Sequence, residues 1–457
     1  MTTWILFSLY AVATAALAIA GSRQISSAKD FALGSGRMNP VVAGLALGAC
    51  LASSATFVIV PGFVYADGLP ALIGFTLPLI AGLGVGLFAL AFRFQASGRD
   101  LGALTIPHWL GARYDSDALR RGFACLNVLN VAYLVLVTVG AAYVMQVALG
   151  VEYRWAVIGI VAFVFSYTAL GGATAHAWTN AMQGSVMLVV TLAIVGSGAS
   201  RIPEVVADLQ ATGFTATDSV LFGTWWEVWL VPFVMGLALT TQPHLLAKAL
   251  YVESPRDVRV TLWVGIAAFA TYCLVLLAGA YARLALGPDI PQDQVMAQYL
   301  AVAFPWGPAA SIASVAILAA AMSTLDGLLV AISASVGNDL FSGPRSLWAS
   351  RLTLLALGIA TIVLALSPPR LVMIFGQIGV YGLVVASAGP ILNGLFRQGP
   401  LDGRVAIAAA TVGLAIHLGL CMVVPNPGVA ALAGLAVSVP LAVWGRVPER
   451  IAGLIQA

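Results

Sequence analysis

The chain has 457 residues, of which 61% are hydrophobic and only 9% are charged, and its mean hydropathy is +0.99. A soluble fold of this length cannot bury so much apolar surface, so the composition excludes a soluble globular protein and indicates a polytopic membrane protein. The net charge is only +3, and no basic patch with interleaved aromatic residues occurs, which excludes a nucleic-acid-binding protein.

Thirteen apolar windows follow one another along the chain. A transmembrane helix needs about 20 mostly apolar residues, so we predict an all-α membrane protein with about 13 transmembrane helices. The windows lie near residues 3–21, 40–66, 70–95, 122–149, 154–172, 177–199, 226–250, 259–286, 307–336, 351–367, 371–396, 403–424 and 428–445.

The basic residues indicate the orientation of these spans, because Lys and Arg gather in cytoplasmic connections. With the N-terminus outside, only four of the 21 basic residues fall in outer connections: Arg154, Arg201, Arg283 and Arg370. The other 17, Lys248 among them, fall inside. We therefore expect a multi-pass protein of the plasma membrane with its N-terminus outside and its C-terminus in the cytoplasm. Basic residues follow the first window rather than precede it, which favours a retained span over a cleaved signal peptide.

Short elements are expected in three connections. Residues 105–114 mix apolar and basic side chains, which is typical of a helix in the membrane interface. Residues 200–225 and 287–306 carry Pro, Gly, Asp and Thr and predict short structured loops or surface helices.

The cysteines and histidines indicate neither a disulfide pattern nor a metal centre. His176 is assigned to an inner connection. For Gln242 and His244 two interpretations stay open: they line an inner pathway, or they form hydrogen bonds at a helix end. The four cysteines lie inside apolar windows and are expected to be packing residues: Cys50, Cys125, Cys273 and Cys421.

The second and seventh windows are each interrupted by a small or hydroxylated run with a proline after it. These are residues 49–56 with Pro61, and residues 235–241 with Pro243. Interrupted helices at matching positions indicate a transporter built from inverted repeats, whereas prolines also kink membrane helices without any function. The predicted order is an extra helix with its inner loop, a first repeat of five helices, an outer loop with a second repeat of five helices, and two C-terminal helices: residues 1–38, 39–200, 201–397 and 398–457.

Two hydroxyls and a carboxylate lie in the ninth window, at Ser323, Thr324 and Asp326. A charge at that depth costs at least ~2.5 kcal/mol on insertion scales. An intramembrane Asp is therefore a candidate for handling an ion, a proton or a solute, and we expect a transporter.

Several short motifs occur in order along the chain: residues 31–37, Pro61-Gly62 with Tyr65 and Gly68, and residues 105–114, 167–172, 178–183, 242–244 and 321–324. In this order they resemble the sodium:solute symporter family, which includes sodium-coupled carriers of sugars, proline, pantothenate and monocarboxylates. The resemblance covers about residues 25–400. It implies a leucine-transporter-like fold, with an inverted five-plus-five helix repeat, and Na⁺ as the coupling ion.

The resemblance also implies a sodium site between the second and ninth spans. Its ligands would be the backbone carbonyls of Ala49, Ala52 and Ala320 and the hydroxyls of Ser323 and Thr324. Sodium is a hard cation that prefers oxygen ligands, and helix carbonyls are free only where a helix is interrupted. The alternative is that both hydroxyls bond back to carbonyls one turn earlier in their own helix.

Two departures from the family pattern bear on the ions and the solute. Several members carry an Asp at the position of Asn180 and a small hydroxyl residue at that of Asp326, and in some the pair helps to bind a second sodium. Three interpretations stay open here: Asp326 and Asn180 form a second cation site, Asp326 is protonated and relays H⁺, or it is neutral and hydrogen-bonded to Asn180. Proline carriers have an Asp at the position of Leu51 and aromatic residues at those of Met235 and Leu239, which argues against proline.

The solute pocket is expected near the midplane between the second, fourth, seventh and eleventh spans. No intramembrane Arg or Lys is expected to pair with a carboxylate there, although free N–H groups at interrupted helices can hold one. A small organic acid or amino acid is favoured over a sugar. The candidate lining residues are mostly small, hydroxylated or apolar: Ser53, Ser54, Thr56, Tyr133, Tyr143, Met235, Thr240, Thr241, Gln377 and Tyr381.

Together these features predict a secondary active transporter that couples sodium to a small organic solute by alternating access. Its expected partners are that solute and the lipid bilayer, with no obligatory protein partner. An enzyme is disfavoured because no nucleophile, base or metal cluster accompanies the hydroxyls. The alternatives are a proton-coupled carrier of the same fold, a channel, and a transporter-like sensor module, for whose signalling domain the chain has no room.

Overall fold

The computed structural model describes residues 2–445 except residues 24, 26, 35, 306, 342–344 and 369–371. Every regular element in this part of the chain is helical, as predicted. Three basic residues of the predicted topology, Arg370, Arg446 and Arg450, lie outside the described residues.

Ten helices of the described residues are long and apolar enough to cross a membrane, and two bent helix pairs raise the number to twelve. The long helices are α1 (Thr2–Ser22), α6 (Leu77–Asp100), α9 (Val131–Leu149), α10 (Tyr153–Ser197), α14 (Pro255–Tyr272), α17 (Gly307–Ser335), α18 (Arg345–Ala365), α19 (Val372–Phe396), α20 (Gly403–Leu420) and α21 (Pro427–Trp444). The first bent pair is α3 (Pro40–Leu51) with η1 (Ala55–Ile59) and α4 (Val60–Asp67); the second is α12 (Trp225–Leu239) with α13 (Pro243–Leu246) and η4 (Ala247–Leu250).

Shorter helices extend or connect these spans. They are α2 (Ala28–Leu33), α5 (Leu69–Gly74), α7 (Ile106–Tyr114), α8 (Asp117–Leu126), η2 (Asn127–Asn130), η3 (Ala199–Arg201), α11 (Ile202–Ala211), η5 (Cys273–Leu276), α15 (Leu277–Ala285), α16 (Val295–Ala303) and η6 (Val336–Leu340). The two long outer connections, predicted as short structured loops or surface helices, contain α11, which is mostly exposed, and α16, most of whose residues are buried.

Helix α10 contains two of the predicted spans. Its 45 residues, at about 1.5 Å of rise per residue, would be about twice as long as the ~30 Å hydrocarbon core is thick. Gly172 interrupts it with φ 49° and ψ −149°, a conformation that side-chain-bearing residues rarely adopt. Dividing α10 there turns the twelve candidate spans of the described residues into the predicted thirteen.

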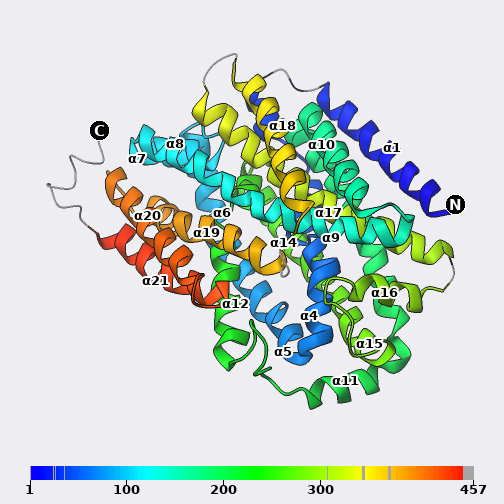
Figure 1. Ribbon diagram of the computed structural model, residues 1–457. Helices are drawn as coiled ribbons and strands as arrows, with labels where there is room; N and C mark the ends of the chain where they lie inside the picture. Colours follow the sequence, from blue (N-terminus) through cyan, green and yellow to red (C-terminus); the bar gives the residue numbers. More distant parts are fainter. Residues whose placement is uncertain are drawn as a thin grey trace.

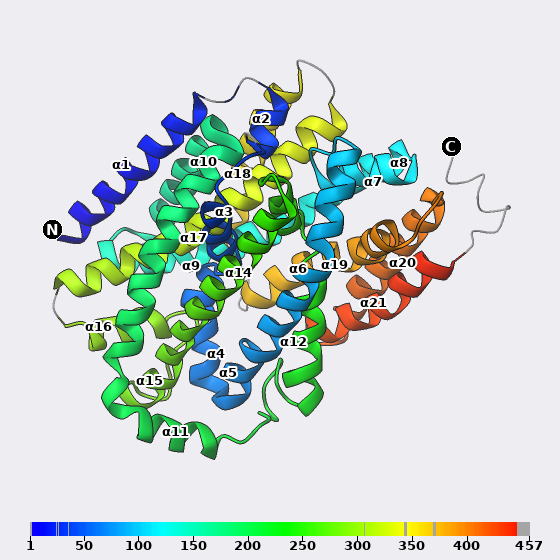
Figure 2. The same ribbon diagram turned by 180° about the vertical axis from the view of Figure 1, so that it is seen from behind.

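The spans surround α17, which lies at the centre of the molecule. In its most apolar stretch 94% of the residues are buried, against 22% for α1 and 28% for α18. Apolar side chains such as Val12 on α1 and Leu352 on α18 are more than 60% exposed, as expected for a surface in contact with lipid. Helices α2 and α7 lie at one end of the bundle and α5 and α11 at the other, which we call the α7 end and the α11 end (Figures 1 and 2).

At the α7 end, α7 and α8 connect the last turns of two spans. Arg120 Nε donates to Asp339 Oδ1 at 2.9 Å, and Thr105 Oγ1 donates to Asp339 Oδ2 at 2.5 Å. Arg113 donates to the backbone carbonyls of Gly394 and Arg397 at the end of α19. The predicted interfacial segment is therefore a helix, but most of its apolar residues are buried in the protein.

At the α11 end, the Pro61-Gly62 motif packs closely against a neighbouring loop. A Cβ on Gly62 would lie 1.9 Å from the carbonyl oxygen of Gln292. Tyr65 donates its hydroxyl to the Gly287 carbonyl, and Arg283 donates to the Tyr65 carbonyl at 2.6 Å. These residues hold α4 against α15 and the chain that follows it.

Candidate functional site

The second predicted span is interrupted after Leu51. Ala52 leaves the helical conformation with φ −93° and ψ 85°, and the axes of the two arms differ by 52°. Ser53 Oγ accepts the N–H of Ala55 at 3.1 Å and caps the second arm. Pro61 lies nine positions after Ala52, inside the second arm formed by η1 and α4, and so does not mark the break. The interruption therefore depends on the small and hydroxylated run and not on the proline.

The seventh predicted span is interrupted after Leu239, and its arms differ by 60°. Here the proline does mark the break, because Pro243 begins α13. Gln242 Nε2 donates to the Val380 carbonyl of α19 at 3.0 Å, so the interpretation of a hydrogen bond at a helix end is correct for Gln242.

Candidate sodium ligands from α3 and α17 meet beside the first break. Ser323 Oγ donates to the Ala49 carbonyl at 3.0 Å and to the Ala320 carbonyl at 2.7 Å. Thr324 Oγ1 donates to the carbonyl of Cys50 at 3.3 Å. Ala52 is fully buried just past the end of α3. Ser323 thus bonds both back to its own helix and across to α3, which brings three of the five predicted ligands together.

The carboxylate of Asp326, one turn further along α17, is fully buried and has three hydrogen-bond donors. His176 Nδ1 lies 2.9 Å from Oδ1, while Tyr167 and Thr179 each donate a hydroxyl to Oδ2 at 3.1 Å. Asn180 donates to the Ser323 carbonyl at 2.8 Å instead, and its own amide oxygen has no hydrogen-bond partner. The hydrogen bond between Asp326 and Asn180 that one interpretation required is therefore not formed.

Lys248 is the residue that the sequence interpretation missed. Its Nζ lies 2.6 Å from His176 Nε2, and it is only 2% exposed. The assignment of Lys248 and His176 to inner connections was therefore wrong, because His176 is buried inside α10 and Lys248 is buried in η4. A signal was present, since the apolar window 226–250 includes Lys248.

Cys50 connects the two groups of residues. Its thiol donates to the Ser323 carbonyl at 3.5 Å and lies 4.0 Å from His176 Nε2. Cys50 was predicted to be a packing residue, and the structure adds that its thiol also has polar neighbours. Among the described residues, no group of three or more His, Cys, Asp or Glu side chains is arranged to hold a metal ion.

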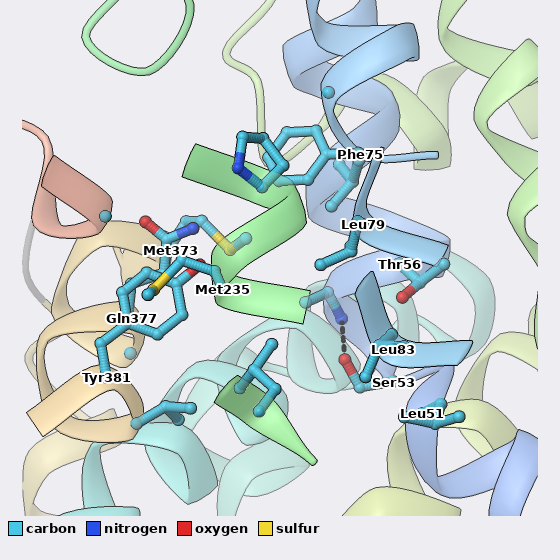
Figure 3. Close-up of a pocket in the computed structure, with 18 of the residues that line it drawn as sticks. Leu51, Ser53, Thr56, Phe75, Leu79, Leu83, Met235, Met373, Gln377 and Tyr381 are labelled. Carbon is cyan, nitrogen blue, oxygen red and sulfur yellow. Dashed lines mark hydrogen bonds between the residues drawn. The ribbon is translucent and has the colours of Figure 1, made fainter. Parts of the chain in front are cut away.

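A cavity lies on the other side of the first break, and it encloses about 1200 Å³ when its open mouth is included. Figure 3 shows Ser53 and Thr56 on one side of it and Met235, Gln377 and Tyr381 on the other. Six of the ten predicted lining residues border it: Ser53, Thr56, Tyr133, Met235, Gln377 and Tyr381.

The other four predicted lining residues are not among the residues that border this cavity. Ser54 donates to the Val137 carbonyl at 2.9 Å, and the Tyr143 ring lies 5.2 Å from that of Tyr153. Thr240 and Thr241 donate to carbonyls of their own helix, at 2.6 and 2.8 Å. The hydroxyl groups of Thr240 and Thr241 therefore donate to backbone carbonyls nearby in the chain, and the sequence pattern does not reveal this.

Most of the remaining lining is apolar, and this was not predicted. Phe75 faces the cavity from the turn between α5 and α6, and Leu79 and Leu83 face it from α6 (Figure 3). Glu227 also borders it, and accepts hydrogen bonds from Thr224 at 2.6 Å and from Asn426 at 3.0 Å. The cavity therefore combines one charged residue and a few polar groups with a large apolar surface.

His244 lines two cavities. It borders the large cavity and also a smaller one of about 350 Å³, which reaches Thr105 and Ser335 near the α7 end. The interpretation that His244 lines a pathway is therefore supported by its position between the two cavities. Its Nδ1 atom is buried without a hydrogen-bond partner.

The order of helices and the paired interruptions agree with one family of known proteins. The model of the sodium:solute symporter family matches residues 31–398. The chain belongs to this family. The symporter is 26% identical over 429 residues to a sodium/proline symporter of Salmonella typhimurium, covering 85% of this chain and 83% of the relative. It is 27% identical over 408 residues to a sodium/pantothenate symporter of Escherichia coli, covering 84% and 82%.

Solved structures show the same fold. A Na⁺-coupled sialic acid symporter in a substrate-bound outward-open state matches with a TM-score of 0.81 and 19% identity, over 99% of this chain and 98% of that one. A transporter of the nucleobase-cation-symport-1 family matches with a TM-score of 0.57 and 13% identity, over 92% and 96%. The symporter has the predicted leucine-transporter-like fold and is a sodium-coupled solute transporter of the membrane. The comparisons give no support to the proton-coupled and sensor alternatives.

Proposed function

We propose that the symporter binds one sodium ion between α3 and α17, with the carbonyls of Ala49, Ala52 and Ala320 and the hydroxyls of Ser323 and Thr324 as ligands. The observation that carries this proposal is the position of Ser323 Oγ, within 3.0 Å of carbonyl oxygens from both helices. Hydroxyl and carbonyl oxygens are neutral, hard ligands that suit a weakly held, exchangeable monovalent cation.

The same interrupted segment supplies both the ion site and the cavity. Ala49 and Cys50 offer carbonyls to α17, while Ser53 and Thr56 border the cavity a few residues further on. An ion that orders this segment therefore also orders one wall of the cavity. This gives a physical basis for coupling, because a ligand that rigidifies shared structure lowers the cost of binding the next one.

The solute we propose is a small organic molecule, with an organic acid or amino acid favoured. The relatives named for proline and pantothenate support this class. Tyr133, Gln377 and Tyr381 offer hydroxyl and amide groups, and the large apolar wall suits a solute with an aliphatic portion. Proline itself is disfavoured, because Leu51 and Met235 replace the residues expected of proline carriers.

Transport is proposed to proceed by alternating access, with the N-terminus outside and the α7 end in the cytoplasm. The distribution of basic residues supports this orientation. His244 borders both cavities, which supports a pathway that joins them during the transport cycle.

The proposal is tested by uptake of labelled solutes into proteoliposomes with imposed sodium or proton gradients. We expect sodium-dependent uptake of at least one organic acid or amino acid. Ser323→Ala should raise the sodium concentration for half-maximal uptake at least about tenfold, because a hydrogen-bonding or coordinating group next to a charge contributes ~1.5–3 kcal/mol.

Ser333→Ala is the matched control. Ser333 is equally buried on the same helix, but its hydroxyl bonds to the Leu329 carbonyl one turn earlier. We expect it to leave the sodium dependence unchanged. Uptake driven by protons at every pH without sodium, or equal effects of the two substitutions, would refute the proposed site.

A further inference from the structure

We propose that Lys248 is a tethered cation that neutralises Asp326 through His176, so that the symporter binds one sodium ion and no second free cation. The inference rests on the proposed sodium site, because it concerns the charge next to that site. It replaces the hypothesis that Asp326 and Asn180 form a second cation site.

The hydrogen-bond directions in this chain of three residues are set by its ends. A charged ammonium only donates, so His176 Nε2 accepts from Lys248 Nζ at 2.6 Å. The imidazole proton then resides on Nδ1, which donates to Asp326 Oδ1 at 2.9 Å. A neutral imidazole thus joins one positive to one negative side chain, and the group as a whole has no net charge.

Burial makes this neutrality necessary. The side chains of Asp326 and His176 are 0% and 1% exposed, and Lys248 is 2% exposed. A buried charge without a partner is strongly unfavourable, whereas a paired and hydrogen-bonded one is tolerated. Among the described residues, His176 Nδ1 is the one Lys, Arg or His side-chain nitrogen within 4.0 Å of an Asp326 carboxylate oxygen, so the charge of Lys248 reaches Asp326 through the imidazole.

The donors around Asp326 compete with a second ion for the carboxylate oxygens, and they prevail while Lys248 balances the negative charge. Oδ2 accepts from Tyr167 and Oδ1 accepts from His176. The Thr179 hydroxyl lies 3.1 Å from Oδ2 and shares its one proton with the Ala175 carbonyl at 2.9 Å. These groups occupy two to three of the roughly four acceptor positions of a carboxylate, and an added ion has to compete with them. Asn180, the other member of the hypothetical site, directs its amide to the Ser323 carbonyl.

The tether also joins elements that belong to different parts of the fold. Lys248 lies in η4, the second arm of the interrupted seventh span, while His176 lies in α10 and Asp326 in α17. Asp326 follows Ser323 by one helical turn, and Cys50 contacts both His176 and the Ser323 carbonyl. The ammonium is therefore positioned beside the proposed sodium site, in an element that is separate from the sodium ligands.

The first experiment measures equilibrium binding of radioactive sodium to the purified symporter in detergent, without any solute. We expect one sodium ion per protein and a Hill coefficient of 1, with affinity at least about tenfold weaker in Ser323→Ala. Two ions per protein, one of which is lost in Asp326→Asn, would overturn the inference while leaving the proposed function intact. No sodium binding under any condition would instead overturn the proposed function.

The second experiment is a charge-neutralisation cycle with Lys248→Met, Asp326→Asn and the double variant. Each single change leaves an unpaired buried charge, so we expect at least a tenfold loss of correctly folded protein and of uptake. In Lys248→Met the protein that does fold should bind a second sodium ion. The double variant should recover folded protein to within about threefold of the original and bind one sodium ion again.

The exposed ion pair between Asp117 and Arg121 on α8 is the matched control. The same neutralisations there should have small, additive effects, because both side chains are at least 60% exposed. The inference would be overturned if the double Lys248/Asp326 variant gave no more folded protein than either single variant. A Lys248→Met protein that folds normally and binds one sodium ion would also overturn it.

Discussion

Gly327 has no side chain, and this allows the close contact between Asp326 and His176. A Cβ at this position would lie 2.4 Å from Cys50 Sγ and 3.1 Å from His176 Cε1. Only glycine therefore lets α17 approach α3 and α10 closely enough for Asp326 to meet His176.

Substituting Gly327 by alanine should move Asp326 away from His176. Overpacking in a tight core typically costs ~1–3 kcal/mol, so we expect Gly327→Ala to lower the melting temperature in detergent and weaken sodium binding severalfold. Gly122→Ala is the control, because nothing lies within 4 Å of a Cβ at that exposed helical position. Equal melting temperatures and sodium affinities for the two variants would contradict this account.

At the level of residues, the sequence singles out Ser323 and Asp326 but not the side chains that surround them. Ser323 and Asp326 stand out because polar groups are rare inside an apolar window. Lys248 and His176 did not, because both lie near the edge of a predicted span, where a charge normally marks a connection. Their partner Asp326 is 78 and 150 positions away, respectively, and such distant pairing is not visible in one sequence.

At the level of elements, the division of α10 depends on one glycine. Gly172 has φ 49°, and a Cβ there would lie 2.7 Å from the Phe31 carbonyl oxygen. The positive φ allows the helix to change direction, and the missing Cβ allows α2 to pack against the bend. The two halves become separate spans only because of this residue.

Gly172→Ala should therefore destabilise the protein. The combination of φ 49° and ψ −149° is essentially restricted to glycine and costs a residue with a side chain about 1–3 kcal/mol, and the contact with Phe31 adds to this. We expect a lower yield of folded protein and a lower melting temperature. Gly159→Ala in the same helix is the control, since a Cβ there meets nothing within 4 Å. If both variants melt alike, the glycine is not required for the bend.

The interrupted spans were predictable, but the reason for one of them was not. In both, a small and hydroxylated run marks the break, and in the seventh span Pro243 begins the second arm. In the second span the break precedes Pro61 by nine positions, because Ala52 and Ser53 end one helix and cap the next. Single-sequence reasoning recognises proline as a helix breaker more readily than a serine cap deep inside a membrane span.

At the level of the whole molecule, the predicted orientation is the part still to be measured. Gln210 on α11 and Asp100 at the end of α6 are exposed and lie in predicted outer and inner connections. In a cysteine-free background, a membrane-impermeant maleimide should label the Gln210→Cys variant in intact cells. It should label Asp100→Cys only after permeabilisation. The reverse pattern would show that the N-terminus is cytoplasmic.

The arrangement of the spans could be predicted from the sequence, but the identity of the solute could not. Apolar windows and basic residues report on spans one at a time, and they are largely independent of side-chain packing. The cavity is different, because Tyr133, Met235 and Gln377 come from three helices and meet only after the bundle has formed. Its large apolar wall, with Phe75 and Leu83, combines residues that are unremarkable in any membrane span.

The burial of Lys248 also has a consequence for how the protein is made. When η4 leaves the ribosome, α10 and His176 already exist, but α17 with Asp326 has not yet been synthesised. An ammonium group without its carboxylate costs ~2.5–3.5 kcal/mol at the centre of a bilayer. We therefore expect the second arm of this span to stay near the aqueous surface during synthesis and to settle in the bundle only after α17 has emerged. A nascent chain truncated before α17 should leave that arm accessible to protease, so membrane integration depends on sequence that comes later.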